Sequence, residues 1–295
     1  MASAELQMVI DLLRAQPIPR DQSFADQRAA IESLTAMAPR PEDVTFTPLE
    51  AGGRPAEWVA APGAGEQQAL LYLHGGGYCI GSIKTHRLLA ADLSRAAGVR
   101  VLLVDYRLAP EHPFPAAVDD AVAAYRFLLD AGFDRRRLAI AGDSAGGGLT
   151  AATLLALRDS DTPLPAAAAL LSPWLDLSQS GESMTSRADV DPMVQREPLQ
   201  RMADAYLAGA DARMPLASPL FADLRHLPPL LIHVGTAETL LDDARRFAAR
   251  ASEAGVEATL EVWDDMIHVW HAFGFLPEAR DANARVGSFL RQHLG

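Results

Sequence analysis

Short apolar runs alternate with longer segments of helical periodicity through most of the chain. The apolar runs have the length of buried strands and lie at residues 69–73, 99–104, 138–141, 166–171, 230–234 and 258–263. Apolar residues recur every three or four positions in the segments 86–97, 116–129, 145–158, 240–254 and 277–293. Continuous apolar strands that alternate with helices predict a mostly parallel sheet covered on both faces, with ligand-binding residues just after the strands.

The first sixty or so residues follow a different pattern. Two amphipathic helices are predicted, one around Leu6–Leu13 with Ser3 as its N-cap and one around Phe24–Leu34, separated by a proline-containing break at residues 17–19. Two short strand candidates, 44–49 and 56–61, flank the pair Gly52-Gly53. Strands separated by a glycine turn predict an antiparallel hairpin.

One connection between predicted strands is unusually long. Residues 172–229 include a helical segment at 197–207 and a proline- and serine-rich stretch at 215–229. Because connections within compact domains are usually short, we expect a lid or an inserted subdomain here. The predicted organisation is a single domain over residues 1–295, with a cap formed by about 1–40 and 180–215.

Composition narrows the classes of partner and compartment. The chain has 295 residues, with 26 Lys and Arg against 38 Asp and Glu, so its formal net charge is −12, which argues against nucleic acid or an anionic membrane as the main partner. No apolar run approaches the roughly 20 residues of a membrane span. The N-terminal segment lacks the basic and apolar regions of a secretory signal, so we expect a cytoplasmic protein. The one cysteine, Cys79, excludes an intrachain disulfide and a cysteine-based zinc site.

Ser144 stands in the sequence context of a catalytic nucleophile. The pattern G-x-S-x-G, with glycines at Gly142 and Gly146, lies directly between an apolar strand and a helical segment. A serine on such a sharp turn needs glycines two residues away on either side, because side chains there would clash. A glycine-rich turn without catalytic function is the alternative, but the strand–turn–helix context favours a nucleophile.

A second glycine motif, H-G-G-G at 74–77, follows the first apolar strand of the alternating region. A flexible turn and a phosphate-binding loop are the alternatives, but neither G-K-[ST] nor G-x-G-x-x-G follows a strand here. Together with a nucleophilic serine, the motif predicts an oxyanion hole. Its expected donors are the backbone amides of Gly76, Gly77 and Ala145.

These motifs and their order resemble the hormone-sensitive-lipase-like branch of the α/β hydrolases, bacterial family IV. H-G-G-G-Y, D-Y-R-L-A-P-E-H-P and G-D-S-A-G-G occur at 74–78, 105–113 and 142–147, and S-P-W, A-S-P-L and L-P-P follow at 172–174, 217–220 and 227–229. The resemblance implies an α/β-hydrolase fold, with an eight-stranded mostly parallel sheet flanked by helices, an antiparallel second strand and a helical cap. It also implies hydrolysis of carboxylic esters without a metal or an organic cofactor.

A nucleophilic serine requires a base, and in this fold the acid and then the base follow the serine in chain order, each after a late strand. Of the eight histidines, two remain as candidates in the loop after the last predicted strand, His268 and His271. The others are excluded by position: His74, His86 and His112 precede the serine, His226 precedes its strand, His233 lies inside one and His293 is on the terminal helix. The resemblance favours His268, because the family usually carries its base in a stretch like M-I-H at 266–268. His271 is interpreted instead as a partly exposed residue at the start of the last helix.

Three acidic residues follow the strand at 230–234 and could orient the base. The family pattern G-x-x-[D/E]-x-L-x-D-[D/E] matches residues 235–243, and its first acidic position, the catalytic one, falls on Glu238. Aspartate is commoner there, so the glutamate is a departure. Asp242 remains the alternative acid. Asp242 and Asp243 are otherwise interpreted as helix N-terminal charges that complement the dipole.

Four further residues carry smaller predictions. Asp143 is expected to brace the glycine loop through hydrogen bonds, and Cys79 to be a small core residue. Tyr78 is expected to line the substrate pocket, although packing explains an aromatic residue there equally well. Gly148 stands where the family often has asparagine, with no clear catalytic consequence.

The expected activity is that of a serine carboxylesterase with the triad Ser144, His268 and Glu238. A compact cap favours acyl groups of about two to eight carbons, as the resemblance to bacterial members suggests. A lactone hydrolase or amidase with the same triad is one alternative. A non-catalytic small-molecule receptor is another, although such receptors generally lose a triad residue. The unpaired edge of the sheet favours a homodimer.

Overall fold

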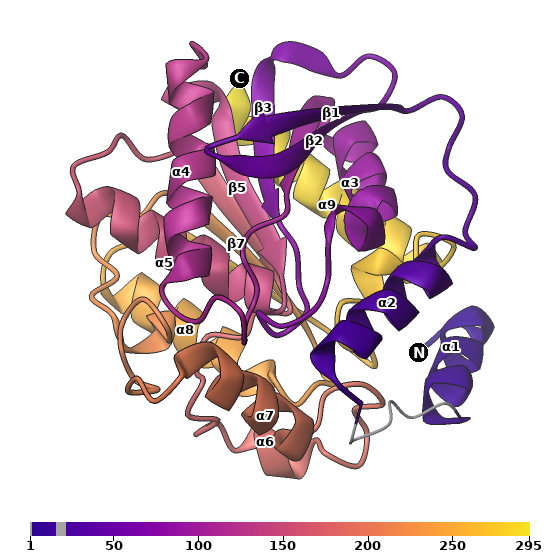
Figure 1. The fold of residues 1–295 in the computed structure, drawn as a ribbon. Coiled ribbons are helices and arrows are strands. Elements are labelled where there is room, and N and C mark those ends of the chain that lie inside the picture. Colours follow the sequence, from indigo (N-terminus) through magenta and orange to yellow (C-terminus); the bar gives the residue numbers. More distant parts are fainter. Residues whose placement is uncertain (1, 16–21) are drawn as a thin grey trace.

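A computed structural model describes residues 2–15 and 22–295 of the chain. Its centre is one eight-stranded sheet in the order β1-β2-β4-β3-β5-β6-β7-β8 (Figure 1). The strands are β1 Thr45–Ala51, β2 Arg54–Ala60, β3 Gly65–Leu73, β4 Val99–Val104, β5 Leu138–Asp143, β6 Ala167–Leu171, β7 Leu230–Gly235 and β8 Ala258–Trp263. Strand β2 is antiparallel to both β1 and β4, and β4, β3 and β5 to β8 are mutually parallel, so the predicted hairpin and fold class are confirmed.

Helices flank this sheet and extend beyond one of its ends. The α-helices are α1 Ala4–Ala15, α2 Phe24–Thr35, α3 Ile83–Ala97, α4 Ala116–Asp130, α5 Ala145–Asp159, α6 Ser183–Ser186, α7 Arg196–Leu207, α8 Leu241–Glu253 and α9 Pro277–Leu294. Figure 1 shows α3 and α9 on one face of the sheet and α4, α5 and α8 on the other. None of the helices in the described ranges is both long and apolar enough to cross a bilayer.

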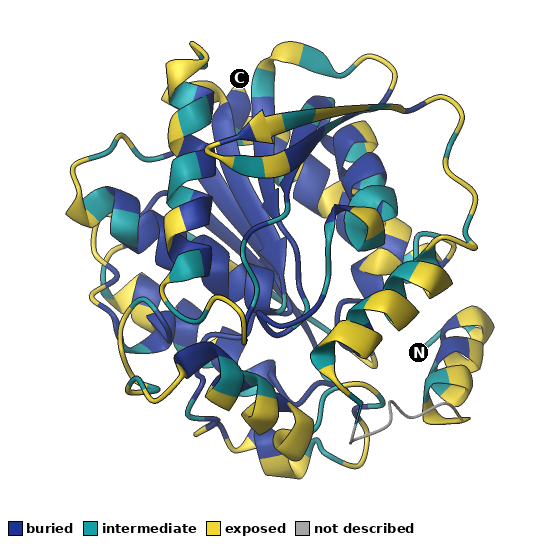
Figure 2. Cartoon of the chain, in the orientation of Figure 1, coloured by how far each residue is buried: buried dark blue, intermediate teal, exposed yellow. Residues whose placement is uncertain are grey.

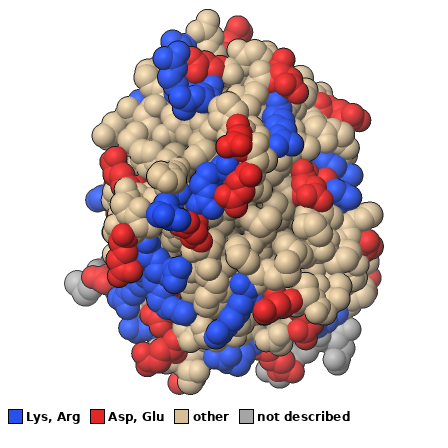
Figure 3. Space-filling model, turned by 90° about the vertical axis from the view of Figure 1, so that its left-hand side faces the viewer, with Lys and Arg blue, Asp and Glu red and all other residues tan. Residues whose placement is uncertain are grey.

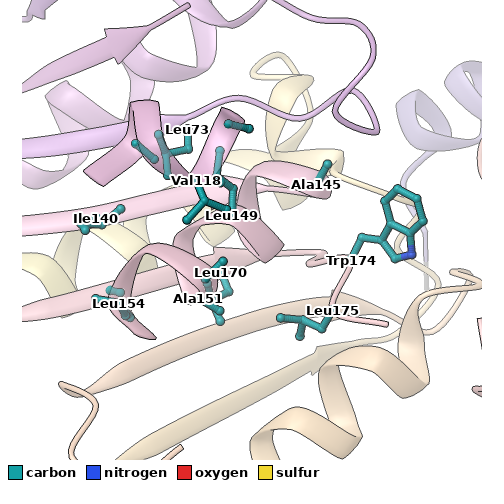
Figure 4. Packing of buried hydrophobic residues seen from close by; sticks show 14 of the residues in the cluster. Leu73, Val118, Ile140, Ala145, Leu149, Ala151, Leu154, Leu170, Trp174 and Leu175 are labelled. Carbon is teal, nitrogen blue, oxygen red and sulfur yellow. The ribbon is translucent and has the colours of Figure 1, made fainter. Parts of the chain in front are cut away.

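The alternation of side chains along the strands divides the interior into two cores. Leu71 and Leu73 of β3 pack with α4, α5 and α8 on one face, whereas Leu70 and Tyr72 pack with α3 and α9 on the other. Figure 2 shows the central strands buried along their length, and Figure 4 shows Leu73, Ile140 and Leu170 meeting Leu149 of α5. Coverage of both faces explains why these strands appear in the sequence as continuous apolar runs.

Two elements begin earlier than their apolar patterns predict. Strand β3 starts at Gly65, so it includes the polar residues 66–68 before its buried half. Helix α3 starts at Ile83 rather than near 86, because two acceptors satisfy its first amides. Thr85 Oγ1 accepts a hydrogen bond from Ser82 N at 2.9 Å, and Asp105 Oδ1 accepts one from Ile83 N at 2.6 Å.

The segments expected to form the cap contact loops at the carboxyl ends of the strands. Helices α2 and α7 reach the loop after β3, where Arg28 hydrogen-bonds to Cys79 and Met202 lies against Gly77. Ser3 caps α1, its Oγ accepting from Leu6 N at 3.1 Å, as predicted. The predicted break at 17–19 lies outside the described residues. The assignment of these segments to a cap on a single domain stays a prediction, as does a homodimer through β8, the last strand and one of the two edge strands of the sheet.

Candidate active site

Ser144 lies on the tight turn between β5 and α5, half-buried, with φ of 53° and ψ of −121°. A positive φ is uncommon for a residue with a side chain, and surrounding contacts must hold it. Two hydrogen bonds do so: Ser144 N donates to Leu171 O and Trp174 N donates to Ser144 O, both at 2.8 Å. A Cβ atom on Gly142 or on Gly146 would collide with neighbouring backbone carbonyls, which explains the glycines of G-x-S-x-G.

Three predicted residues from three separate loops meet at this turn. His268, in the loop between β8 and α9, places Nε2 2.9 Å from Ser144 Oγ. Its Nδ1 lies 2.9 Å from Oε2 of Glu238, which follows β7. His268 is 5% exposed and Glu238 is fully buried. The geometry therefore supports a nucleophile, a base and an acid in one hydrogen-bonded chain.

A residue that the sequence reasoning missed holds the second oxygen of Glu238. Oε1 accepts hydrogen bonds from Gly235 N at 2.6 Å and from Ser172 Oγ at 2.8 Å, while Ser172 Oγ accepts one from Val269 N at 3.1 Å. Ser172 thus connects the acid to the residue after His268. Its place at the end of β6, within the S-P-W motif, was the available signal.

Burial and the neighbouring carboxylate act in opposite directions on His268. Burial is the largest effect and by itself would lower the pKa of the imidazole. The hydrogen bond and the charge of Glu238, together with smaller effects of Asp191 and Asp143, more than offset it. The net result is a pKa above the ordinary histidine value. A carboxylate in this position would stabilise an imidazolium formed by proton transfer from the serine.

Asp242, the alternative acid, is engaged elsewhere. Its Oδ2 accepts a hydrogen bond from Ser183 N of α6 at 2.9 Å. Asp243 also lies in the first turn of α8, but it is 1% exposed, so its interpretation as a helix-dipole charge was incomplete. Its Oδ2 accepts from Leu175 N at 2.8 Å and Asp176 N at 2.9 Å, and burial raises its pKa to about 8.

The prediction for His271 was wrong. The residue is fully buried and lies in a short 3₁₀ helix, Trp270–Ala272, before α9. Its Nε2 lies 3.1 Å from His233 Nδ1, and the Trp270 ring packs on it at 4.0 Å between centroids. Burial lowers the pKa of both histidines. The side chain points into the interior, where it meets His233 of β7.

The glycine loop presents free amides beside Ser144. Gly76 and Gly77 have φ of 115° and 60°, a region that glycine enters without steric cost. Among the described residues, the amides of Gly76, Gly77 and Ala145 donate to no acceptor. Gly76 and Ser144 are both half-buried, while their neighbours in the two motifs are buried. This arrangement supports the predicted oxyanion hole.

Asp143 braces the glycine loop, as expected. Its Oδ1 accepts hydrogen bonds from Gly75 N at 3.0 Å and from Tyr72 Oη at 2.8 Å. His86 Nε2 lies 3.4 Å from the same oxygen. Burial opposes the charge of this carboxylate, but His86 and the hydrogen bonds hold its pKa below the ordinary value. Sequence reasoning set His86 aside because it precedes the serine, which excludes the role of base but not that of support.

Tyr78 is 1% exposed, and its ring stacks on Tyr206 of α7 at 3.8 Å between centroids. Packing accounts for the ring, and a contact with substrate stays a prediction. Cys79 is fully buried, which confirms it as a core residue. A Cβ atom on Gly148 would collide with the Trp174 carbonyl and lie 2.9 Å from the Tyr78 hydroxyl, so asparagine does not fit there.

The surface and the side-chain chemistry add two observations. Figure 3 shows basic and acidic side chains interspersed over one face, without a large area of one sign. Within residues 2–15 and 22–295, no group of three or more His, Cys, Asp or Glu side chains is arranged to hold a metal ion.

Comparisons with known proteins agree with this geometry. A family model described as the alpha/beta hydrolase fold matches residues 70–272. An acetyl-hydrolase from Streptomyces hygroscopicus is 47% identical over 300 residues, covering 100% of this chain and 99% of the relative. An esterase from Acinetobacter venetianus is 35% identical over 264 residues, covering 89% of this chain and 87% of the relative. A crystal structure of an esterase from the bacterial hormone-sensitive lipase family has a TM-score of 0.96 at 52% identity and covers 100% of both chains.

Proposed function

This chain belongs to the hormone-sensitive-lipase-like branch of the α/β-hydrolase family, and we propose that it is a serine carboxylesterase acting on short- to medium-chain esters of small molecules. The names of its relatives, acetyl-hydrolase and esterase, support ester hydrolysis. The observation that carries the serine mechanism is the continuous hydrogen-bonded chain from Ser144 through His268 to Glu238, 2.9 Å at each step.

Acylation begins when Ser144 Oγ attacks the ester carbonyl carbon while His268 Nε2 takes the hydroxyl proton. Glu238, hydrogen-bonded to Nδ1, keeps the other ring nitrogen oriented as the acceptor and stabilises the imidazolium. The carbonyl oxygen becomes an oxyanion and receives hydrogen bonds from the amides of Gly76, Gly77 and Ala145. Loss of one such donor typically lowers the rate by about 10²–10³.

The tetrahedral intermediate then collapses, and the carbon–oxygen bond to the alcohol breaks. The departing alkoxide takes the proton from His268, which returns to its neutral form. Water next attacks the acyl-enzyme, with His268 as base, and the second tetrahedral intermediate releases the carboxylic acid and restores the Ser144 hydroxyl. No step calls for a group outside the chain other than ester and water.

The segments around the site set the expected size of the acyl group. Met202 of α7 lies directly against Gly77, and Tyr206 stacks on Tyr78, so α7 covers the glycine loop. We expect acyl chains of about two to eight carbons to be preferred, because the segments expected to form the cap are compact and the resemblance to bacterial members points to short acyl groups.

The test is a rate profile over p-nitrophenyl esters of increasing acyl length, for the wild type and for Ser144→Ala. We expect the highest kcat/KM among the short esters. Ser144→Ala should lower kcat/KM by at least ~10³, because the groups that remain only bind and polarise the substrate. Ser33→Ala is the matched control, since Ser33 is an exposed serine of α2 whose hydroxyl donates to Ala29 O. Undiminished turnover by Ser144→Ala would refute the assignment, and a lactone and an anilide in the same panel separate the alternative substrates.

A further inference from the structure

Arg28, on α2, makes four hydrogen bonds that connect this helix to the loops after β3 and β4. Its Nε donates to Cys79 O and its Nη2 to Ala109 O, both at 2.7 Å. Nη1 and Nη2 also donate to the two carboxylate oxygens of Glu111, both at 2.8 Å. The Arg28 side chain is 24% exposed, whereas Cys79 and Ala109 are fully buried. The guanidinium therefore does more than form a surface ion pair, because it also binds two buried backbone carbonyls.

The two carbonyls belong to segments that are already joined behind the glycine loop. Ala109 N donates to Tyr78 O at 2.9 Å, so the segment 105–113 lies against the end of the loop. Cys79 N donates to Gly76 O at 3.0 Å, which closes the turn that contains the Gly77 amide. Arg28 Nε donates to the carbonyl oxygen of the same Cys79 residue. A displacement of Cys79 would thus be passed directly to the amides beside Ser144.

The loop needs such support because three consecutive residues have positive φ. Gly76 and Gly77 adopt it freely, but Tyr78, with φ of 62°, carries a side chain in a region that costs free energy. Such a conformation persists only where surrounding contacts hold it. On one side Met202 and Tyr206 of α7 provide them, and on the other the charge-assisted hydrogen bonds of Arg28 do.

We propose that Arg28 is a positioning residue for the oxyanion hole, through which α2 holds the Gly76 and Gly77 amides in the orientation that the tetrahedral intermediate requires. The inference rests on the proposed ester hydrolysis, because it assigns a task within that reaction. The Arg28 contact has two parts: the bonds to the carbonyls act on the loop, whereas the pair with Glu111, whose side chain is 52% exposed, makes no contact with the glycine loop.

Three variants separate these parts. Arg28→Met keeps an unbranched stem of similar length and removes every hydrogen bond. Glu111→Gln removes the ion pair and leaves both carbonyl bonds. Arg95→Met is the matched control, since Arg95 binds both oxygens of Asp43 at 2.9 Å on the outer side of α3 and is 44% exposed.

The quantities to measure are kcat and KM for a short p-nitrophenyl ester and the inhibition constant of a trifluoromethyl ketone. This ketone forms a tetrahedral adduct with the serine. A displaced donor costs less than an absent one, so Arg28→Met should lower kcat by about 10- to 100-fold with KM within about threefold. The inhibition constant should rise by a similar factor. Glu111→Gln and Arg95→Met should stay within about threefold of the wild type in all three quantities.

An unchanged kcat in Arg28→Met, or equal losses in Arg28→Met and Glu111→Gln, would overturn the inference while the wild type remains active. An inactive wild type would instead contradict the proposed function itself, and the inference with it. If Arg28→Met does not fold, Arg28→Lys decides, because its single ammonium cannot reproduce the planar fork that serves both carbonyls. An intermediate kcat then supports the inference, and a wild-type kcat overturns it.

Discussion

The positions of the side chains in the proposed triad depend on one another and on the glycines beside Ser144. The hydroxyl of Ser144 can face His268 because the backbone adopts a positive φ, and the turn closes because Gly142 and Gly146 carry no Cβ atoms. The imidazole is fixed in turn by Glu238, whose own oxygens are fixed by Gly235 N and Ser172 Oγ. Every polar atom that orients the base is therefore itself held by a hydrogen bond.

The pH dependence of Glu238→Gln tests this chain of support. The proposed mechanism needs the neutral imidazole, so kcat/KM should fall as the pH drops through the pKa of His268, which lies above the ordinary histidine value in the wild type. Removing the carboxylate takes away the largest of the effects that oppose burial, so the acid limb should move to lower pH. The plateau should fall by about 10²–10⁴ because the imidazolium loses its counter-charge.

Asp242→Asn is the matched carboxylate-to-amide control, since Asp242 Oδ2 accepts from Ser183 N and not from the base. It should keep both the plateau and the acid limb of the wild type. A Glu238→Gln profile that coincides with the wild type, or a full loss in Asp242→Asn instead, would show that the acid had been assigned to the wrong residue.

The sequence predicted the three residues of the proposed triad but not the residues that support them. Chain order, the strand positions and the family resemblance were enough to select His268 and Glu238. Ser172 and His86 act through contacts with residues 66 and 57 positions away respectively, and such pairings depend on how the strands are ordered in the sheet. His271 was misplaced for the same reason, because its partner His233 lies on β7, 38 positions earlier in the chain.

The elements around the site are joined by buried carboxylates. Asp243 of α8 accepts hydrogen bonds from the backbone after β6, and Asp191, 4% exposed, accepts one from Thr239 N at 2.8 Å, next to Glu238. The second contact ties the segment before α7 to the acid loop. Neither aspartate has a local pattern that would predict burial, so both contacts were missed from the sequence.

The buried carboxyl of Asp243 should make stability depend on pH in an unusual direction. Its pKa is raised from 3.8 to about 8 in the folded chain, so between these values the folded state holds a proton that the unfolded state has released. Its contribution is therefore complete below the unfolded pKa and is lost as the pH rises through the folded pKa. Asp243→Asn, which stays neutral, should gain stability relative to the wild type as the pH rises.

Urea unfolding near pH 5 and near pH 9 measures this difference. The free energy of unfolding of Asp243→Asn minus that of the wild type should be larger near pH 9. Asp242→Asn, at a less buried site of the same helical turn, should show a smaller change with pH. An equal difference for Asp243→Asn at both pH values would contradict the shifted pKa.

For the molecule as a whole, the patterns predicted the sheet and its two covered faces better than the position of the cap. Continuous apolar strands that alternate with helices predict a sheet buried on both sides. The separate cores on the α3–α9 and α4–α5–α8 faces confirm this. Amphipathic periodicity shows that α2 and α7 each bury one face, but it does not show which part of the molecule that face contacts. Their places are set by single long-range contacts, such as Arg28 with Cys79 O and Met202 with Gly77.

The most direct test of the central claim is covalent labelling of the intact chain by a p-nitrophenyl alkylphosphonate, followed by peptide mapping. Cleavage after arginine gives the peptide 138–158, in which Ser144 is the only serine. We expect one phosphonyl group per chain, carried by this peptide, with esterase activity falling in proportion to its incorporation. Full activity in chains labelled at Ser144, or loss of activity with the label elsewhere, would contradict the assignment.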